Sequence, residues 1–142
     1  MTRRQEREEA FFMLFEADFS PSKAAEEIYS DAKDARDVEE SEYIRTVTEG
    51  VRAHRKELDA LIDPHLHGWK RSRLSGVARS VILLAAYEML YMPEIPTHVS
   101  LNEAVELMKK YDDEKARVFV NGVLNAFSRD EAVIAKREAC QK

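Results

Sequence analysis

The chain has 142 residues, of which 44% are hydrophobic and 35% are charged, and its formal net charge is −5. This balance excludes a disordered chain, and a single cysteine excludes a disulfide framework. The negative charge is a poor overall match to nucleic acid, whose binding rests on neutralising phosphates, although local basic stretches remain. With only four glycines and four prolines, the chain is predicted to form one all-α domain or two small helical subdomains that share a core.

The most apolar run, Val81–Leu90, reads VILLAAYEML. It has about half of the roughly 20 residues that a helix needs to cross a bilayer, so a buried central helix is the better interpretation. No signal peptide is recognisable. We therefore expect a cytoplasmic protein that makes no use of a membrane.

The first predicted helix spans residues 3–19, where an apolar stripe runs beneath a charged N-terminal end. A second helix is predicted at about 22–34, with Pro21 suited to its first turn. It is weakly apolar and is expected to lie on the surface. From residue 42 to 67 apolar residues recur every three or four positions, and a break is expected near His54–Lys56.

A further helix is predicted over about 75–91. The one after it begins at a capping signal, because Ser100 and Glu103 have the spacing at which a hydroxyl and a carboxylate satisfy opposite backbone amides. Thr97 is the alternative start. Core-facing residues then follow at helical spacing as far as Tyr111.

The stretch FVNGVLN (119–125) contains an Asn-Gly pair, which is a strong hairpin signal between apolar strands. Here the apolar residues on both sides recur at three and four positions, so a helix over about 113–128 is predicted instead. A glycine inside a helix costs roughly 1 kcal/mol relative to alanine, and close approach of another helix backbone is the usual reason to tolerate it. The charged tail that follows has little to bury.

The chain resembles the NusB family of transcription antitermination factors in four segments: RRQEREEAFFMLFE (3–16), LSGVARSVILLAAYEML (74–90), IPTHVSLNEAVELMKKY (95–111) and FVNGVLN (119–125). The resemblance extends over nearly the whole chain. It implies one NusB-like domain over 1–142, with about seven helices in two small packed bundles. The N-terminal subdomain would cover about 1–68 and the C-terminal subdomain about 69–142.

The resemblance also implies a function without catalysis. NusB proteins bind the boxA element of nascent RNA together with NusE, a ribosomal protein of the small subunit. The pair helps RNA polymerase to read through terminators, notably in ribosomal RNA operons. No cofactor is implied.

The resemblance places candidate RNA contacts at several positions. Guanidinium groups suit phosphate because they donate two parallel hydrogen bonds and stay protonated, and aromatic rings can stack on unpaired bases. Family members commonly carry an acidic residue where this chain has Lys115 and Asn125, so both substitutions favour RNA. The candidate residues are Arg3, Arg4, Arg7, Phe15, His65, Lys115 and Asn125. WKRSR (69–73) is a secondary candidate, because a surface loop explains it equally well.

Ala78, Arg79 and Leu83 lie on the helix that the resemblance assigns to NusE binding. Many family members have an acidic residue in place of Ala78 and an arginine in place of Leu83. DPHLH (63–67) contains two histidines, but nothing near it completes a set of ligands, so no metal site is predicted.

Two other functions are open on the sequence. NusB-like domains also occur as N-terminal modules of RNA cytosine methyltransferases, which need a further catalytic domain. The other is a purely protein-binding helical module, such as a homodimer that covers its own RNA-binding face, and the net acidity favours it.

Overall fold

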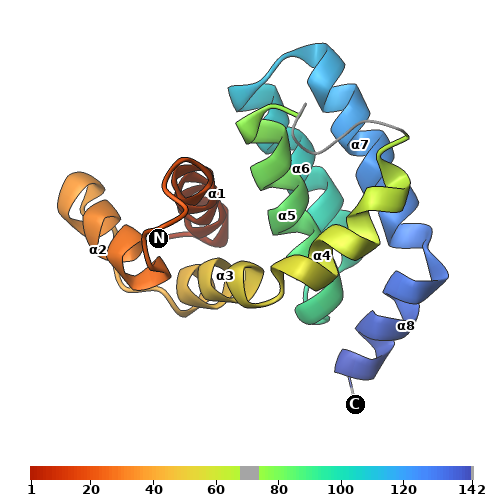
Figure 1. Ribbon diagram of the computed structural model, residues 1–142, viewed down its shortest axis with the longest axis horizontal. Helices are drawn as coiled ribbons and strands as arrows, with labels where there is room; N and C mark the ends of the chain where they lie inside the picture. Colours follow the sequence, from red (N-terminus) through yellow and green to blue (C-terminus); the bar gives the residue numbers. More distant parts are fainter. Residues whose placement is uncertain (68–73, 142) are drawn as a thin grey trace.

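The computed structural model describes residues 1–67 and 74–141 of the chain (Figure 1). In these residues it contains eight α-helices and one short 3₁₀ helix, and no strand. The helices are α1 (Arg3–Phe19), α2 (Ala25–Arg36), α3 (Glu42–Ala53), α4 (Arg55–Ile62), η1 (Asp63–His65), α5 (Gly76–Tyr91), α6 (Thr97–Tyr111), α7 (Glu114–Arg129) and α8 (Glu131–Cys140).

The predicted all-α class is confirmed, as is the helix break, which falls at His54 between α3 and α4. The described residues form eight α-helices where about seven were expected, because the tail forms α8. Val133 anchors this helix with 2% of its surface exposed. Arg137 fastens it further, donating to the backbone carbonyls of Met89, Pro93 and Ile95 at 2.6 to 3.2 Å, around the C-terminal end of α5.

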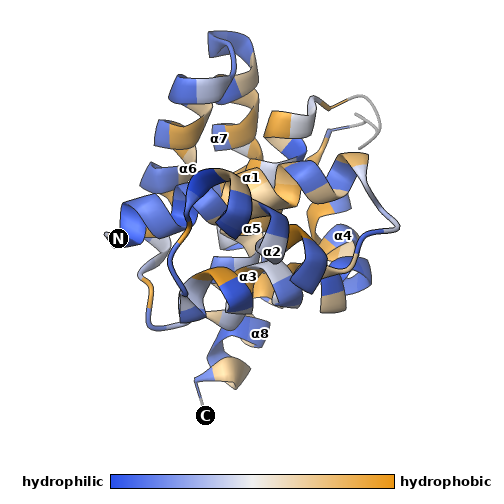
Figure 2. Ribbon diagram, turned by 90° about the vertical axis from the view of Figure 1, so that its left-hand side faces the viewer, coloured by the Kyte–Doolittle hydropathy of each residue, from blue (hydrophilic) through white to orange (hydrophobic). Residues whose placement is uncertain are grey.

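Helix α5 is the centre of the molecule (Figure 1). It packs against α1, α3, α4, α6, α7 and α8, and almost every residue from Ala78 to Leu90 is buried. The outer helices alternate between hydrophilic and hydrophobic positions, as is clear along α7 in Figure 2, because only one face of each meets the core. A single cluster of buried side chains joins both halves of the chain. The division at residues 68 and 69 stays a prediction.

The prediction that a capping box starts α6 is wrong. The helix begins at Thr97, the alternative start, directly after Pro96. The hydroxyl of Ser100 instead donates to Glu88 at 2.7 Å, and the carboxylate of Glu103 accepts hydrogen bonds from α1. Both side chains therefore bind other helices and are not available to cap their own.

Helix α2 begins three residues later than expected. A turn closed by the hydrogen bond from the Lys23 amide to the Ser20 carbonyl, at 3.0 Å, places Pro21 ahead of the helix. The helix is also less superficial than its weak pattern indicated. Ile28 and Tyr29 are 3% and 2% exposed, because they pack over α1 and α3.

A buried carboxylate joins four helices at the core. Glu88 of α5 has no exposed surface. It accepts hydrogen bonds from Arg7 of α1 and Ser100 of α6, each at 2.7 Å, and from the hydroxyl of Tyr43 of α3. Burial and the charge of Glu88 raise the pKa of Tyr43, so its hydroxyl remains a donor. One charged side chain thus fixes the relative positions of α1, α3, α5 and α6.

Asn121-Gly122 lies inside α7, so the helical prediction is confirmed, but the expected reason for the glycine is wrong. Gly122 is exposed, and a Cβ added there would meet no atom within 4 Å. A glycine that does admit a close neighbour is Gly50 of α3, where a Cβ would lie 2.2 Å from the hydroxyl of Tyr87.

Gly50 and Gly122 give opposite predictions for alanine. Gly122→Ala should raise the free energy of unfolding by about 1 kcal/mol, because it removes backbone entropy from the unfolded chain without a clash. Gly50→Ala should lower it by about 1–3 kcal/mol, because the ring of Tyr87 must shift. Urea denaturation of both variants measures these changes. A change of the same sign in both would contradict this reading of the packing.

Glu88→Gln should lower the free energy of unfolding by about 3–5 kcal/mol, because it removes the buried counter-charge of Arg7 and leaves only the longer contact with Glu103, at 3.7 Å. Glu106→Gln on α6 is the matched control. Its side chain is 51% exposed, and Lys109, at 3.5 Å, is its one ion-pair partner within residues 1–67 and 74–141, so the loss should stay below about 1 kcal/mol. Similar losses in the two variants, again by urea denaturation, would refute the central role of Glu88.

Candidate nucleic-acid interface

The first turn of α1 carries two exposed arginines. Arg3 lies over the ring of Tyr43, with its guanidinium carbon 4.5 Å from the ring centroid, and its Nε is 3.5 Å from the carboxylate of Glu6. Arg4 points to α6, where Nε and Nη2 donate to the carboxylate of Glu103 at 3.1 to 3.2 Å. The two cations therefore leave α1 in different directions, one over α3 and one over α6.

Arg7, the third arginine of the motif, is inside the protein with 4% of its surface exposed. Its Nε donates to Glu88 at 2.7 Å, and its Nη1 is 3.7 Å from Glu103. Burial alone would lower the pKa of Arg7, but the hydrogen bond and charge of Glu88 outweigh it and raise the pKa. Arg3 and Arg7 do share a face of α1, as their spacing predicts, but this face is turned to Tyr43. The structure gives Arg7 a place in the core.

A groove of about 550 Å³ runs between α1 and α6. Its cations come from both walls, and each is close to a carboxylate. Lys110 donates to Glu8 at 2.7 Å, and Arg4 is paired with Glu103. Burial would raise the pKa of Glu8, but hydrogen bonds from Lys110 and Tyr111 lower it overall, so the carboxylate is charged at neutral pH. The groove presents paired charges, and of its cations Arg4 and Lys110 are exposed to a competing anion such as phosphate.

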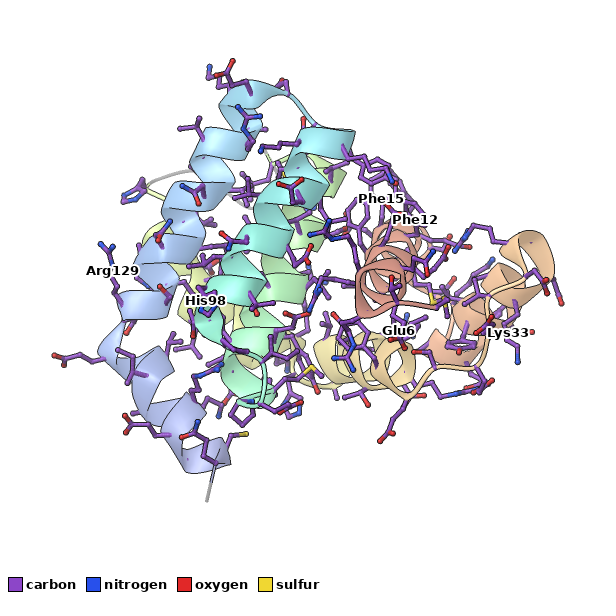
Figure 3. The ribbon with its side chains drawn as sticks, turned by 180° about the vertical axis from the view of Figure 1, so that it is seen from behind. Glu6, Phe12, Phe15, Lys33, His98 and Arg129 are labelled. Carbon is purple, nitrogen blue, oxygen red and sulfur yellow. The ribbon has the colours of Figure 1, made fainter. Side chains whose placement is uncertain are left out.

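The ring of Phe15 is at some distance from the arginines, eleven residues or about 16 Å along α1 from Arg4. Phe15 is half-buried and covers Gly76, where a Cβ would lie 2.7 Å from the ring. It contacts Phe19 edge-to-face at 4.9 Å, and Phe19 is 68% exposed. Figure 3 shows Phe12 beside Phe15 on the side of α1 opposite Glu6. This side of α1 offers aromatic surface for stacking or for a protein partner.

Two candidates come from α7, which lies beyond α6 from α1 in Figure 3. Lys115 is exposed in the first turn of the helix. Asn125 lies ten residues, or about 15 Å, further along. Its side-chain amide donates to the carbonyl of Asn121 at 2.9 Å, so part of its hydrogen-bonding capacity is used inside the helix.

His65 joins η1 to the start of α8. Its Nε2 is 2.7 Å from the carboxylate of Asp130, and its ring meets Phe127 edge-on at 6.3 Å. The hydrogen bond from His65 lowers the pKa of Asp130, as does the one from the amide of Ala132, which Asp130 caps. His65 is therefore held in the packing between η1, α7 and α8, apart from the arginines of α1.

The candidate residues for partner binding differ in exposure. Ala78 and Leu83 are buried, with 3% and 7% of their surface exposed. The guanidinium of Arg79 binds Asp18 at 2.6 Å through Nη2 and the carbonyl of Leu74 at 2.6 Å through Nη1. Arg79 and Leu83 line a cavity of about 330 Å³ formed with residues of α1, α2 and α3. Arg79 and Leu83 therefore meet at one cavity, whereas Ala78 does not line it.

Sequence reasoning missed two features of these surfaces. Phe19 follows Phe15 by one helical turn, so the spacing alone could have placed it on the same face. Glu103, in contrast, is 99 positions from Arg4, and no local pattern predicts that pairing. The WKRSR segment (69–73) lies outside the described residues.

The described part of the chain offers no group of three or more His, Cys, Asp or Glu side chains that could hold a metal ion. Within the same residues, no helix combines the length and the apolar character needed to cross a bilayer. What these surfaces supply is hydrogen-bond donors, positive charge and aromatic rings, which suit binding of a charged polymer or a protein.

The sequence matches known proteins over almost its whole length. The NusB family model matches residues 4–129. The transcription antitermination protein NusB of Bacillus subtilis is 42% identical over 131 residues, covering 92% of this chain and 97% of the relative. The protein of the same name from Listeria monocytogenes is 40% identical over 124 residues, covering 87% and 94%.

Solved structures of NusB proteins have the same fold as this chain. NusB of T. maritima superposes with a TM-score of 0.85 at 32% identity, covering 97% of this chain and 98% of that one. A crystal structure of antitermination factors NusB and NusE in complex with dsRNA contains a chain with a TM-score of 0.79 at 28% identity, covering 91% and 98%. The motifs, the helical fold and these relatives lead to one conclusion: the chain belongs to the NusB family.

Proposed function

We propose that this protein is a transcription antitermination factor that binds boxA-type RNA together with NusE and acts on RNA polymerase in ribosomal RNA operons. It works in the cytoplasm by binding and without catalysis. The observation that carries the proposal is the match over nearly the full length to the chain found in the complex of NusB, NusE and dsRNA.

The RNA surface that we propose is centred on Arg3 and Arg4. Both are exposed at the N-terminal end of α1, and their guanidinium groups suit phosphate. On α7, we propose Lys115 and Asn125 as contacts with the RNA. We propose that His65 and Phe15 stack on unpaired bases. Because Arg7 is bound to Glu88, we infer that it supports this surface from within.

For NusE we propose the neighbouring surface around the cavity that Arg79 and Leu83 line. Ala78 is buried beside them and would act through the packing of α5. The ring of Phe19, 68% exposed, does not line this cavity, and we propose it as a separate contact for a protein partner, on the side of α1 that carries Phe15. Aromatic side chains are common anchors in protein interfaces.

Fluorescence anisotropy of a labelled boxA-type RNA, with and without NusE and across a salt series, tests the function and the arginine site together. Binding should be tighter with NusE present. Each phosphate neutralised on a single strand contributes about −0.7 to the slope of log affinity against log salt. The double variant Arg3→Ala/Arg4→Ala should therefore make this negative slope shallower by about 1.4. It should also weaken binding at every salt concentration.

The control is the double variant Arg52→Ala/Lys56→Ala, which removes the same amount of charge from exposed positions at the junction of α3 and α4. Its RNA binding is measured without NusE. Its slope should match that of the wild type. Absence of RNA binding even with NusE would overturn the function. An unchanged slope in the Arg3/Arg4 variant would overturn only the site.

A duplex of the same sequence should bind more weakly than the single strand, because its bases cannot stack on aromatic side chains.

A further inference from the structure

The Arg4–Glu103 pair has a specific geometry. The carboxylate accepts from Nε of Arg4 at 3.1 and 3.2 Å and from Nη2 at 3.2 Å. A guanidinium has two edges that can each make a pair of parallel hydrogen bonds, and Glu103 occupies the Nε–Nη2 edge. Nη1 of Arg4 has no hydrogen-bond partner among the described residues, and the side chain is 71% exposed. The outer Nη1–Nη2 edge is therefore available to a second anion.

Glu103 is itself held from beneath. Its side chain is only 16% exposed, and its Oε1 is 3.7 Å from Nη1 of Arg7. Arg7 is in turn bound to Glu88 through a side chain that is 5% exposed, against 1% for Glu88. These four side chains form a line of alternating charge that runs from the core of the protein to the wall of the α1–α6 groove.

This order of charges decides what an approaching phosphate meets. The two arginines and two glutamates balance each other, so the line carries no net charge. Arg4 is the outermost member, with Glu103 behind it. A phosphate thus contacts the cation first, and an exposed arginine that is already ordered loses less rotamer freedom on binding than a free one.

We propose that Glu103 is a positioning residue for RNA binding, which holds Arg4 with its Nη1–Nη2 edge directed at a backbone phosphate. This inference rests on the proposed RNA-binding function. It differs from the alternative that Glu103 competes with phosphate for Arg4, because the two predict opposite effects of removing the carboxylate.

A double-mutant cycle tests the inference. RNA affinity in the presence of NusE is measured by anisotropy for the wild type, Glu103→Ala, Arg4→Ala and the double variant. Each single variant should bind several-fold more weakly than the wild type and lose about 0.7 from the salt slope. Since both remove the same phosphate contact, the double variant should bind no more weakly than Arg4→Ala. Glu103→Gln, which keeps one acceptor for Arg4, should recover part of the affinity.

Glu106→Ala is the matched control, one turn further along α6 with its side chain 51% exposed, and it should cause no loss. A gain of affinity in Glu103→Ala would show that the carboxylate competes with RNA and overturn the inference. Additive losses in the double variant would do the same, because a merely structural role of Glu103 would weaken binding whether or not Arg4 is present. A wild-type protein that binds no RNA would overturn the proposed function itself, whereas normal RNA binding by Glu103→Ala would overturn only the positioning role.

Discussion

The structure depends on a carboxylate that has no contact with water. Glu88 lies near the C-terminal end of α5, among buried apolar residues of that helix, and a buried charge is tolerated only when it is paired and hydrogen-bonded. Arg7, Tyr43 and Ser100 satisfy it from three other helices. Such a pair adds little net stability compared with apolar packing, but it strongly penalises any arrangement that separates the two charges. This requirement restricts how α1 can pack against α5.

The same pair shapes the candidate RNA surface. Because Arg7 is used in the core, the arginine motif presents two cations to solvent instead of three. Arg7 also lies within 3.7 Å of Glu103, which in turn binds Arg4, so the order of the core extends to the wall of the α1–α6 groove. Surface and core are therefore not independent, and a change at Glu88 should alter both stability and the position of Arg4.

Local patterns in the sequence were sufficient for most of the fold. The span of α1, the break at His54 and the helical state of Asn121-Gly122 all follow from apolar spacing, which depends on residues within a few turns. The errors arise where a side chain binds a distant partner. Ser100 and Glu103 have the spacing of a capping box, yet each is used by another helix. Gly122 has no close neighbour, and nothing in the packing explains why a glycine stands at this position.

The candidate site was less accessible to prediction for the same reason. Family resemblance located the arginine motif, and helical spacing correctly grouped Arg3 with Arg7. Whether such a face meets solvent or a buried acid depends on a residue 81 positions away, and no local pattern contains that information. The pairing of His65 with Asp130, 65 positions apart, is a second case.

NMR of the arginine Nε–H groups during an RNA titration would distinguish the arginine of the core from the arginine of the surface. The Nε–H of Arg7 should exchange slowly with water in the free protein, because it is buried against Glu88. Its resonance should stay in place when RNA is added, while that of Arg4 shifts. Loss of protection at Arg7, or a shift as large as that of Arg4, would contradict the assignment of Arg7 to the core.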